Sequence, residues 1–596
     1  MITLDFETEG IVGNPIVNPP KPIGLAVLKT NRECDGLYIT DWELMKQVWL
    51  EALDSKEPLL FHNAPFDLSV GLHWLGGKEP AWERVHDTIF ILFQTDPYSR
   101  SLSLKPSADH YLDLPPQEEE HLHNWIMSNV PEATKSTAGA YICHAPVQLV
   151  SPYAIGDCFR TRLLYDKLIG GINITSYERE QRLAPKLRES SVKGIRLDVE
   201  RLQEDYDSCV ASMSTCDDRI YDALGCTEFN IGSGIQLADR LDRAGMVDDW
   251  ILTAKGRRST AKDNLIKCCK DQDLVALLAY RSTMKTCTGT FMGPWLQFAE
   301  GDGRVHTEWN QVANDEGQHA GTRTGRLSSS RPNFQNPPNP FYTDTPDGLA
   351  DLPNMRSYLL PEEDHVWIKR DFSSQEIRIL AHFEDGALMR AYQEDPFLDP
   401  HDMARTLIHE HTGVWYPRDD VKQTGFGIIY GMGVPGLAQQ LGRPRGEAHT
   451  LREAYFGAMP AAAQLASSTR ARGRSGGSIT TWGGRKYFSE PPKMIKGQMR
   501  TFEYKLLNYL IQGSAGDQTK QVLCDWWDGK GDAVFTSTIH DEINASVPKE
   551  DWRKHMSFLK ESMDQPYFDV PMRSEGFSGE NWGLLNKMTK EEDYEV

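Results

Sequence analysis

Short apolar runs that end in polar or acidic turns occur towards both ends of this chain, whereas its middle reads as amphipathic helices. Residues 3–7 and 59–61 have the pattern of strands that end beside carboxylates. Residues 366–368 form another such strand, and the apolar positions after it fall on one helical face. From about residue 173 to 298 the pattern is helical and charged. We therefore expect an α/β unit, then a helical segment, then an α+β unit.

Length and composition narrow the class of protein. A chain of 596 residues is too long for one core, so three or more domains or subdomains are expected. Hydrophobic residues make up 39% and charged residues 25%, which is typical of soluble globular proteins. No run of 18 apolar residues occurs, and acidic residues lie within the first seven positions, so we expect neither a membrane span nor a secretory signal. The ten cysteines have no metal-site spacing, which favours reduced thiols in a cytoplasmic compartment.

The net charge of −21 does not by itself indicate a nucleic-acid-binding protein, because local patches decide such contacts. Three basic clusters are present, and each alone is more typical of a solvated face than of a phosphate-binding track. Together they raise the expectation of phosphate binding. The clusters are Arg182, Lys186, Arg188, Lys193 and Arg196; Lys255, Arg257, Arg258 and Lys262, with Arg281 and Lys285 further on; and Arg470, Arg472, Arg474, Arg485 and Lys486.

A carboxylate at the end of a buried strand, just before a helix, is a common place to hold a divalent cation, and Asp371 has this position. The alternative is structural, since Ser373 and Glu376 have the spacing of a capping box. Two later strands, over residues 534–539 and 543–547, would place Asp541 at a hairpin tip. Beside Asp371, this second carboxylate would complete a cation site.

Four carboxylates in the first 160 residues form a second candidate site. Asp5 and Glu7 share one face of a strand, and Asp67 follows the next strand. Tyr153 and Asp157 lie four apart on one helical face. Oxygen ligands of this kind suit two Mg²⁺ or Mn²⁺ ions, which can activate water for phosphodiester hydrolysis. Tyr153 would orient that water.

Each of these acids also has a structural interpretation. Asp5 and Glu7 are also typical of an ordinary polar edge strand, and Asp67 is typical of a helix cap. Asp157 could pair with Arg160 or Arg162. The combined order and spacing resemble the three motifs of proofreading 3′–5′ exonucleases, which have a ribonuclease H-like α/β fold.

Arg418, Lys422, Phe426 and Tyr430 recur at four-residue intervals, which places all four on one helical face. The cations lie near the helix start, where anions are favoured. A triphosphate along the cations, with its base towards the aromatic rings, fits this order. A core-facing stripe is the alternative, but a core helix would not align arginine and lysine with aromatic residues.

Several amide and cationic side chains are candidates for contacts with base edges in a minor groove. They follow the segment Thr324–Ser329, which is rich in turn residues, and an alternative is a polar surface loop. Two further amide side chains lie four residues apart in the C-terminal part of the chain. The candidates are Arg326, Asn333, Gln335 and Asn336, and then Asn508 and Gln512.

Taken together, these motifs resemble family A DNA polymerases, similar to the large fragment of bacterial DNA polymerase I and its phage relatives. Asp371 with Glu376 matches the first polymerase motif, and the Arg418–Tyr430 helix matches the second. The triplet His540–Glu542 matches the third, and TGRLSS and residues 579–583 also fit. Tyr504 stands where many relatives carry a template-contacting arginine, so that contact is in doubt; Lys505 could substitute.

The resemblance implies a ribonuclease H-like 3′–5′ exonuclease domain followed by a right-hand polymerase domain. We expect an exonuclease domain at 1–172, a thumb at 173–300, a palm at 301–385 and 501–596, and fingers at 386–500. No 5′-nuclease domain is expected before the exonuclease domain.

The resemblance also implies roles for residues. Asp371, Asp541 and Glu542 would be catalytic, the first two as ligands of two Mg²⁺ or Mn²⁺ ions. Lys422 would protonate the leaving pyrophosphate. The remaining implied roles are a phosphate contact for His401, exclusion of ribonucleotides by Glu376 and a DNA contact for His540.

The expected function is template-directed addition of dNTPs to a primer, with proofreading, in the replication of a phage genome in the host cytoplasm. Primer–template DNA and dNTPs are the expected partners, with a helicase, a primase or a single-strand binding protein, and the chain is expected to be a monomer. Two alternatives remain, namely a DNA-binding relative with inactive sites and a nuclease with a vestigial polymerase half. A primer-extension assay with and without EDTA distinguishes them.

Overall fold

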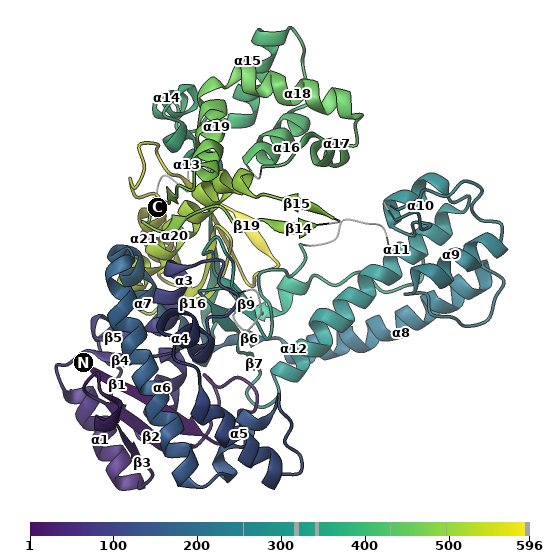
Figure 1. Ribbon diagram of the computed structural model, residues 1–596. Helices are drawn as coiled ribbons and strands as arrows, with labels where there is room; N and C mark the ends of the chain where they lie inside the picture. The colour runs from purple at the N-terminus through teal and green to yellow at the C-terminus, as the bar shows by residue number, and fades with distance from the viewer. Residues whose placement is uncertain (254, 315–320, 340–344, 430, 496, 590–596) are drawn as a thin grey trace.

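A computed structural model describes residues 1–253, 255–314, 321–339, 345–429, 431–495 and 497–589. It has a mixed-sheet unit at the N-terminus, a projecting helical arm, and a larger body built on a second sheet (Figure 1). The expected mixed α/β multidomain architecture is confirmed. Within the described residues, no helix combines the length and apolar character needed to cross a bilayer.

The N-terminal unit is a five-stranded sheet in the order β3-β2-β1-β4-β5. The strand β1 lies at its centre, antiparallel to β2 and parallel to β4, and its apolar positions enter a core with Trp49 and Phe61. Helix α6 packs along β1 and β2. The elements are β1 Ile2–Thr8, β2 Pro22–Leu28, β3 Leu37–Ile39, β4 Leu59–Phe61, β5 Val85–Asp87, α1 Trp42–Asp54, α2 Ala64–Trp74, α3 Thr88–Thr95, α4 Leu104–Leu112, α5 Gln117–Asn129 and α6 Val147–Leu168.

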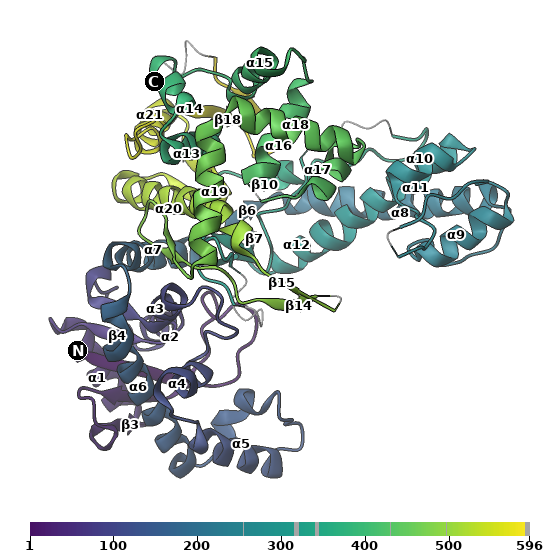
Figure 2. The ribbon, with the colours of Figure 1, turned by 45° about the horizontal axis from the view of Figure 1, so that its top comes forward.

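The arm projects from the body in both views, with α8 and α11 packed along each other (Figures 1 and 2). A three-stranded sheet, β10-β6-β7, lies at its base. The elements are β6 Ile195–Leu197, α8 Val199–Ala223, α9 Gly234–Arg243, α10 Lys262–Cys268, α11 Gln272–Thr286, a π-helical segment Cys287–Met292, α12 Gly293–Phe298, β7 Arg304–Val305 and β10 Leu359–Leu360.

The body is built on an antiparallel sheet in the order β16-β17-β11-β18-β19. The central strand β11 is the strand predicted to end at Asp371, and the predicted hairpin is β16–β17, so both predictions are confirmed. Helices α7 and α20 pack along each other beneath the sheet. The elements are α7 Ile174–Lys193, β11 His365–Phe372, α13 Gln375–Glu384, α20 Leu506–Gly529, β16 Val534–Ile539, β17 Glu542–Pro548, α21 Trp552–Met563, β18 Ser574–Gly579 and β19 Leu585–Lys587.

Six helices between α13 and α20 form a layer at the top of the body in Figure 1. Helix α16 spans Arg418–Ile429, so the predicted helix is confirmed over these residues, while Tyr430 lies outside the described residues. The other elements here are α14 Ala387–Glu394, α15 Pro400–Thr412, α17 Val434–Leu441, α18 Arg445–Ala458 and α19 Pro460–Arg474, and the two-stranded sheets β8 Glu308–Asn310 with β9 Ser328–Ser330, β12 Ile479–Thr480 with β13 Lys486–Tyr487, and β14 Lys493–Ile495 with β15 Gln498–Arg500.

Members of the first and third basic clusters have structural ion pairs. Arg182 and Lys186 on α7 both pair with Asp528 of α20. Arg485 is buried and pairs with Asp517 at 2.6 Å. Through these ion pairs, Arg182, Lys186 and Arg485 join helices and strands of the body.

Candidate functional site

Strand pairing brings together two acids that are 170 positions apart. Asp371 at the end of β11 is opposite Glu542 in the register of β11 and β17. The Phe372 amide donates to the Asp541 carbonyl oxygen at 3.1 Å, and His540 makes the turn before it with φ of 55°. Both carboxylates therefore lie at one end of the central sheet.

The two acids repel each other and are partly removed from water. Burial, with the charges of Asp541 and Glu542, raises the pKa of Asp371 to about 7. Burial raises the pKa of Asp541 to about 6, although Arg326 opposes this rise. Paired oxygen ligands with such repulsion suit a hard divalent cation, which would remove it, so this donor set fits Mg²⁺ or Mn²⁺.

Lys369 keeps the third acid apart from this pair. It shares one face of β11 with Asp371, and its Nζ atom donates to Glu542 Oε2 at 2.9 Å. Asn544 Nδ2 donates to the other oxygen of Glu542, also at 2.9 Å. The same Nζ atom lies 3.8 Å from Asp371 Oδ2. Glu542 is thus satisfied by protein donors, which leaves Asp371 and Asp541 as the better cation ligands.

Helix α16 carries the predicted cationic and aromatic face. Arg418 pairs with Asp399 at 2.6 Å, whose carboxylate also caps α15. Lys422 is exposed, and the ring of Phe426 lies 5.8 Å from that of His401. Burial lowers the pKa of His401 to about 4, so its imidazole is neutral at pH 7 and can offer a phosphate a hydrogen bond rather than a charge.

Glu376 does not close a capping box, so that interpretation is wrong. The N-cap of α13 is Ser374, one residue after the predicted Ser373, and it has φ of 57° and no side-chain hydrogen bond to a helix amide. Glu376 is instead buried and accepts from Arg326 Nη2 at 2.5 Å. Because Arg326 also acts on Asp541, this pair joins the Thr324–Ser329 segment to the acids.

The remaining candidates for DNA contact are placed unevenly. Gln335 is buried, with its amide nitrogen donating to the Thr538 carbonyl at 2.5 Å in β16. Asn333 and Asn336 are exposed on the same loop. Asn508 and Gln512 are half-buried on α20. Lys505, the possible substitute contact, pairs with Glu490 at 2.8 Å.

The N-terminal unit brings three of its four predicted acids together. One oxygen from each of Asp5, Glu7 and Asp157 lies within 4.8 Å of the others. Asp67 lies outside this triplet, and its Oδ1 atom accepts from the Phe6 amide at 2.9 Å. Burial raises the pKa of Asp5 to about 7, and the charge of Asp157 adds to the rise. The oxygen donors and their repulsion again fit a divalent cation.

Lys105 at the start of α4 is a member of this centre that the sequence analysis missed. Its Nζ atom donates to Asp157 Oδ2 at 2.7 Å and lies 4.0 Å from the centroid of the Tyr153 ring. Arg160 also lies near, 3.7 Å from Asp157. Residue 105 is 52 positions from Asp157, and no local spacing indicates the contact.

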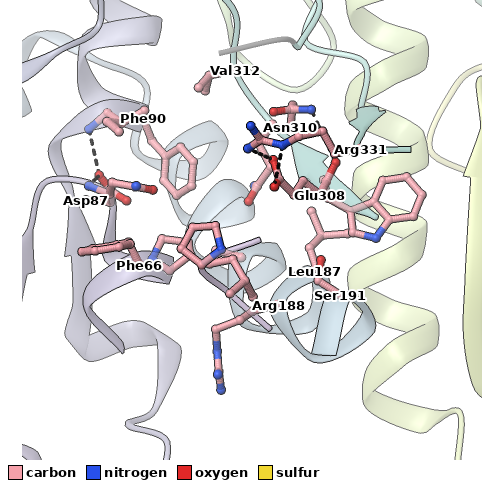
Figure 3. A pocket seen from close by; sticks show the side chains of 18 residues that line it. Phe66, Asp87, Phe90, Leu187, Arg188, Ser191, Glu308, Asn310, Val312 and Arg331 are labelled. Atoms are coloured by element: carbon pink, nitrogen blue, oxygen red, sulfur yellow. Dashed lines mark hydrogen bonds and ion pairs between the residues drawn. The ribbon is translucent and has the colours of Figure 1, made fainter. Parts of the chain in front are cut away.

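A cavity of about 230 Å³ separates the N-terminal unit from the body (Figure 3). Phe66, Asp87 and Phe90 line one side, and α7 contributes Leu187, Arg188 and Ser191. The opposite side comes from β8 and β9, where Arg331 pairs with Glu308 at 2.5 Å. Asp87 is the acid of the N-terminal unit that lines the cavity, whereas Asp5, Glu7, Asp67 and Asp157 are not among its lining residues.

Comparisons with known proteins agree with the resemblance. The model of DNA polymerase family A matches residues 199–584. The chain is 31% identical to DNA polymerase I of Pseudomonas aeruginosa over 462 residues, which are 73% of this chain and 48% of that protein. It is 28% identical to DNA polymerase I of Chloroflexus aurantiacus over 556 residues, 89% of this chain and 55% of that protein. The chain therefore spans about half the length of the curated relatives it matches.

Among solved structures, the fold is similar to the POL domain of Pol1 from M. smegmatis, determined in complex with DNA primer-template and dNTP. The TM-score is 0.74 at 22% identity, over 98% of this chain and 95% of that chain. The family model covers well over half of the present sequence. This chain belongs to DNA polymerase family A.

Proposed function

We propose that this chain is a template-directed DNA polymerase that adds dNTPs to a primer 3′ end. The observation that carries the proposal is the meeting of Asp371 and Asp541 at one end of the central sheet, together with the cationic face of α16 and family membership. Residues 301–385 and 501–596 would be the palm, 386–500 the fingers and 173–300 the thumb. The proposed reaction is phosphoryl transfer to the primer hydroxyl.

Asp371 and Asp541 would hold two Mg²⁺ or Mn²⁺ ions, which when bound lower the pKa of the primer hydroxyl and stabilise charge on the triphosphate. Arg418 and Lys422 would bind the phosphates, and Lys422 would give its proton to the leaving pyrophosphate. Phe426 would stack against the incoming base, and Tyr430 is proposed with it from the sequence alone.

Further contacts follow from the same proposal. Glu376 would fill the space that a ribonucleotide 2′-hydroxyl requires, and Lys369 would keep Glu542 turned towards Asn544. Contacts with primer–template DNA are assigned to Arg326, Asn333, Gln335, Asn336, Asn508, Gln512 and His540.

We also propose a 3′–5′ exonuclease in residues 1–172, with a ribonuclease H-like fold. The supporting observation is the triplet of Asp5, Glu7 and Asp157, beside which Asp67 and Tyr153 lie. Two divalent cations held there would activate a water for hydrolysis of a mispaired 3′ end. Replication of a phage genome in the host cytoplasm, by a monomer working with a helicase, a primase or a single-strand binding protein, completes the proposal.

The test is primer extension by the purified chain with Mg²⁺, with EDTA, and with each dNTP omitted in turn. Asp371→Asn and Asp541→Asn should each abolish extension. Glu363→Gln is the matched control, because this exposed acid lies at the other end of β11. Extension that persists in either aspartate variant contradicts the proposed site.

The exonuclease is tested separately on a labelled primer without dNTPs. Asp5→Ala with Glu7→Ala should abolish primer degradation and leave extension intact. Loss of both activities would contradict two independent sites, and degradation without any extension by the unaltered chain would favour a nuclease with a vestigial polymerase half.

A further inference from the structure

A cleft of about 680 Å³ is lined by residues of the central sheet and of the helical layer that holds α15 and α16. This volume is in the range of about 300–1,000 Å³ that small-molecule sites have. Ser373 and Ser374, which directly follow Asp371 and Phe372, line it together with His401 and Arg418. The opposite wall belongs to α21, β18 and β19 and contains Lys560, Asp564, Arg573, Glu575, Gly576, Lys587, Met588 and Thr589.

Cations outnumber acids on the lining of this cleft. The cations are Arg378, Arg418, Lys560, Arg573 and Lys587, and the acids are Asp399, Asp564 and Glu575. Two of these acids pair with two of the cations, Asp399 with Arg418 and Glu575 with Lys587, which leaves three cations against one acid on the lining. Asp564 accepts from Ser574 Oγ at 2.7 Å. The cleft therefore favours an anion with several charges.

Arg378 adds a positive charge that its own contacts do not neutralise. It is only 3% exposed, and it donates to the carbonyl oxygens of Ser373, Pro396 and Pro571 at 2.7–2.8 Å. These acceptors are uncharged, and within the described residues it makes no ion pair with a carboxylate. A buried charge without a counter-ion attracts an anion from solution, because the low dielectric of the interior screens it weakly.

Arg573 directly precedes β18, the strand that pairs with β11. Its carbonyl oxygen accepts from the Ser373 amide at 2.8 Å, on the β18 side of β11, whereas Asp541 is on the β17 side. Its guanidinium carbon lies 3.4 Å from the centroid of the Phe397 ring, just before α15. A stacked guanidinium presents its edge to a phosphate in the planar geometry that arginine matches well.

We propose that this cleft is a leaving-group site, in which Arg573 and Lys560 bind inorganic pyrophosphate after the nucleotide has been joined. The inference rests on the proposed polymerase function and deepens it. The primer oxygen forms a bond to the α-phosphorus, the bond between that phosphorus and the bridging oxygen breaks, and the electron pair leaves with pyrophosphate. The primer proton passes to solvent. Arg418 and Lys422 bind the triphosphate before this step, and Arg573 and Lys560 bind the product after it.

Arg573→Gln and Lys560→Met test the site against matched controls on the exposed side of α21. Arg553→Gln also removes an arginine stacked on an aromatic ring, since Arg553 lies 4.8 Å from the Trp552 ring, and Lys554→Met removes an exposed lysine from the helix of Lys560. The readouts are inhibition of primer extension by pyrophosphate, and KM for pyrophosphate in the reverse reaction, each compared with KM for dNTP.

In both site variants the inhibition constant and KM for pyrophosphate should rise about tenfold, as expected from loss of one charge-assisted hydrogen bond. KM for dNTP should rise by a clearly smaller factor, and the controls should match the unaltered chain. Arg573→Lys should recover part of the loss. Calorimetric titration with magnesium pyrophosphate alone, without DNA or dNTP, should show the same order of affinities.

Equal pyrophosphate constants in the site variants and the controls overturn the inference. A parallel rise in KM for dNTP also overturns it, because Arg573 would then belong to the triphosphate site. If Arg573→Gln does not fold, Arg573→Lys and Lys560→Met decide on the same readouts. Failure of the unaltered chain to extend any primer would instead refute the polymerase proposal, while titration with pyrophosphate would still report on the cleft.

Discussion

Replacing Asp5 by asparagine should stabilise the N-terminal unit when no divalent cation is bound. The side chain is held near Glu7 and Asp157, with one oxygen of each acid within 4.8 Å of the others. Burial raises its pKa from 3.8 to about 7, the charge of Asp157 adds to the rise, and Lys105 opposes it. An amide of the same shape removes the repulsion and the desolvation of a charge.

The magnitude follows from the shift in pKa. A rise of about three units at about 1.4 kcal/mol each sets an upper limit of about 4 kcal/mol. Asp5 is half-buried and shares its repulsion with neighbouring acids, so we expect about 2 kcal/mol after screening. For a unit of this size, this gain corresponds to a rise in Tm of about 4–8 °C.

The pH dependence has a definite sign. Between pH 4 and 7 the folded chain keeps a proton on Asp5 that the unfolded chain has lost, so stability falls as the pH rises. The loss of folding free energy from ionised Asp5 is complete above pH 7, and it is absent below the pKa of Asp5 in the unfolded chain. The increase in the free energy of unfolding from Asp5→Asn should therefore reach its full value at pH 8 and only a fraction of that value at pH 5.

Thermal unfolding in EDTA, followed by tryptophan fluorescence at pH 5 and pH 8, measures the effect. Asp54→Asn is a suitable control, because this acid is exposed at the end of α1 and its change should alter stability by less than about 0.5 kcal/mol. Adding Mg²⁺ should stabilise the unaltered chain more than Asp5→Asn, since it binds the folded acids. A lower Tm for Asp5→Asn at pH 8, or an equal gain at both pH values, would refute this reasoning.

Three further outcomes are expected. Phe426 has no hydroxyl, so dideoxynucleotides should be poor substrates and Phe426→Tyr should relax this discrimination in a chain-termination assay; equal incorporation by both proteins would contradict the assignment. Glu376→Ala should admit ribonucleotides, and single-nucleotide insertion kinetics would count against its role if the ratio of rNTP to dNTP use did not rise. Lys520→Met should cost about 3–5 kcal/mol in urea unfolding, because buried Glu180 loses its partner at 2.6 Å, and the added change Glu180→Gln should restore part of that loss.

The features that could be predicted from the sequence are those that depend on the spacing of neighbouring residues. An apolar strand that ends at Asp371, a hairpin with Asp541 at its tip and a helix with four-residue spacing are each determined within about a dozen residues. The side-chain periods of 2 and 3.6 are properties of the backbone, so they survive in any fold. Asp371 and Asp541 come together once the hairpin of β16 and β17 pairs with β11.

Contacts between distant side chains were not predictable in this way. Lys105 reaches Asp157 from another helix, and Arg573 lines the cleft from the residue just before β18. The cations of α7 are visible in the sequence, but their pairing with Asp528 of α20 is not. The capping box failed for a related reason, since Ser374 adopts a left-handed conformation that its motif does not reveal.

The two acidic centres share one arrangement of charges. In each, a single lysine forms a close pair with one carboxylate, Lys369 with Glu542 and Lys105 with Asp157. The lysine fixes that acid and leaves a net negative charge on its neighbours, whose pKa values are raised. The buried pair of Lys520 and Glu180, in contrast, is matched in charge. Because uncompensated buried charge is costly, its retention at two separate centres favours a cation from solution as the missing counter-charge.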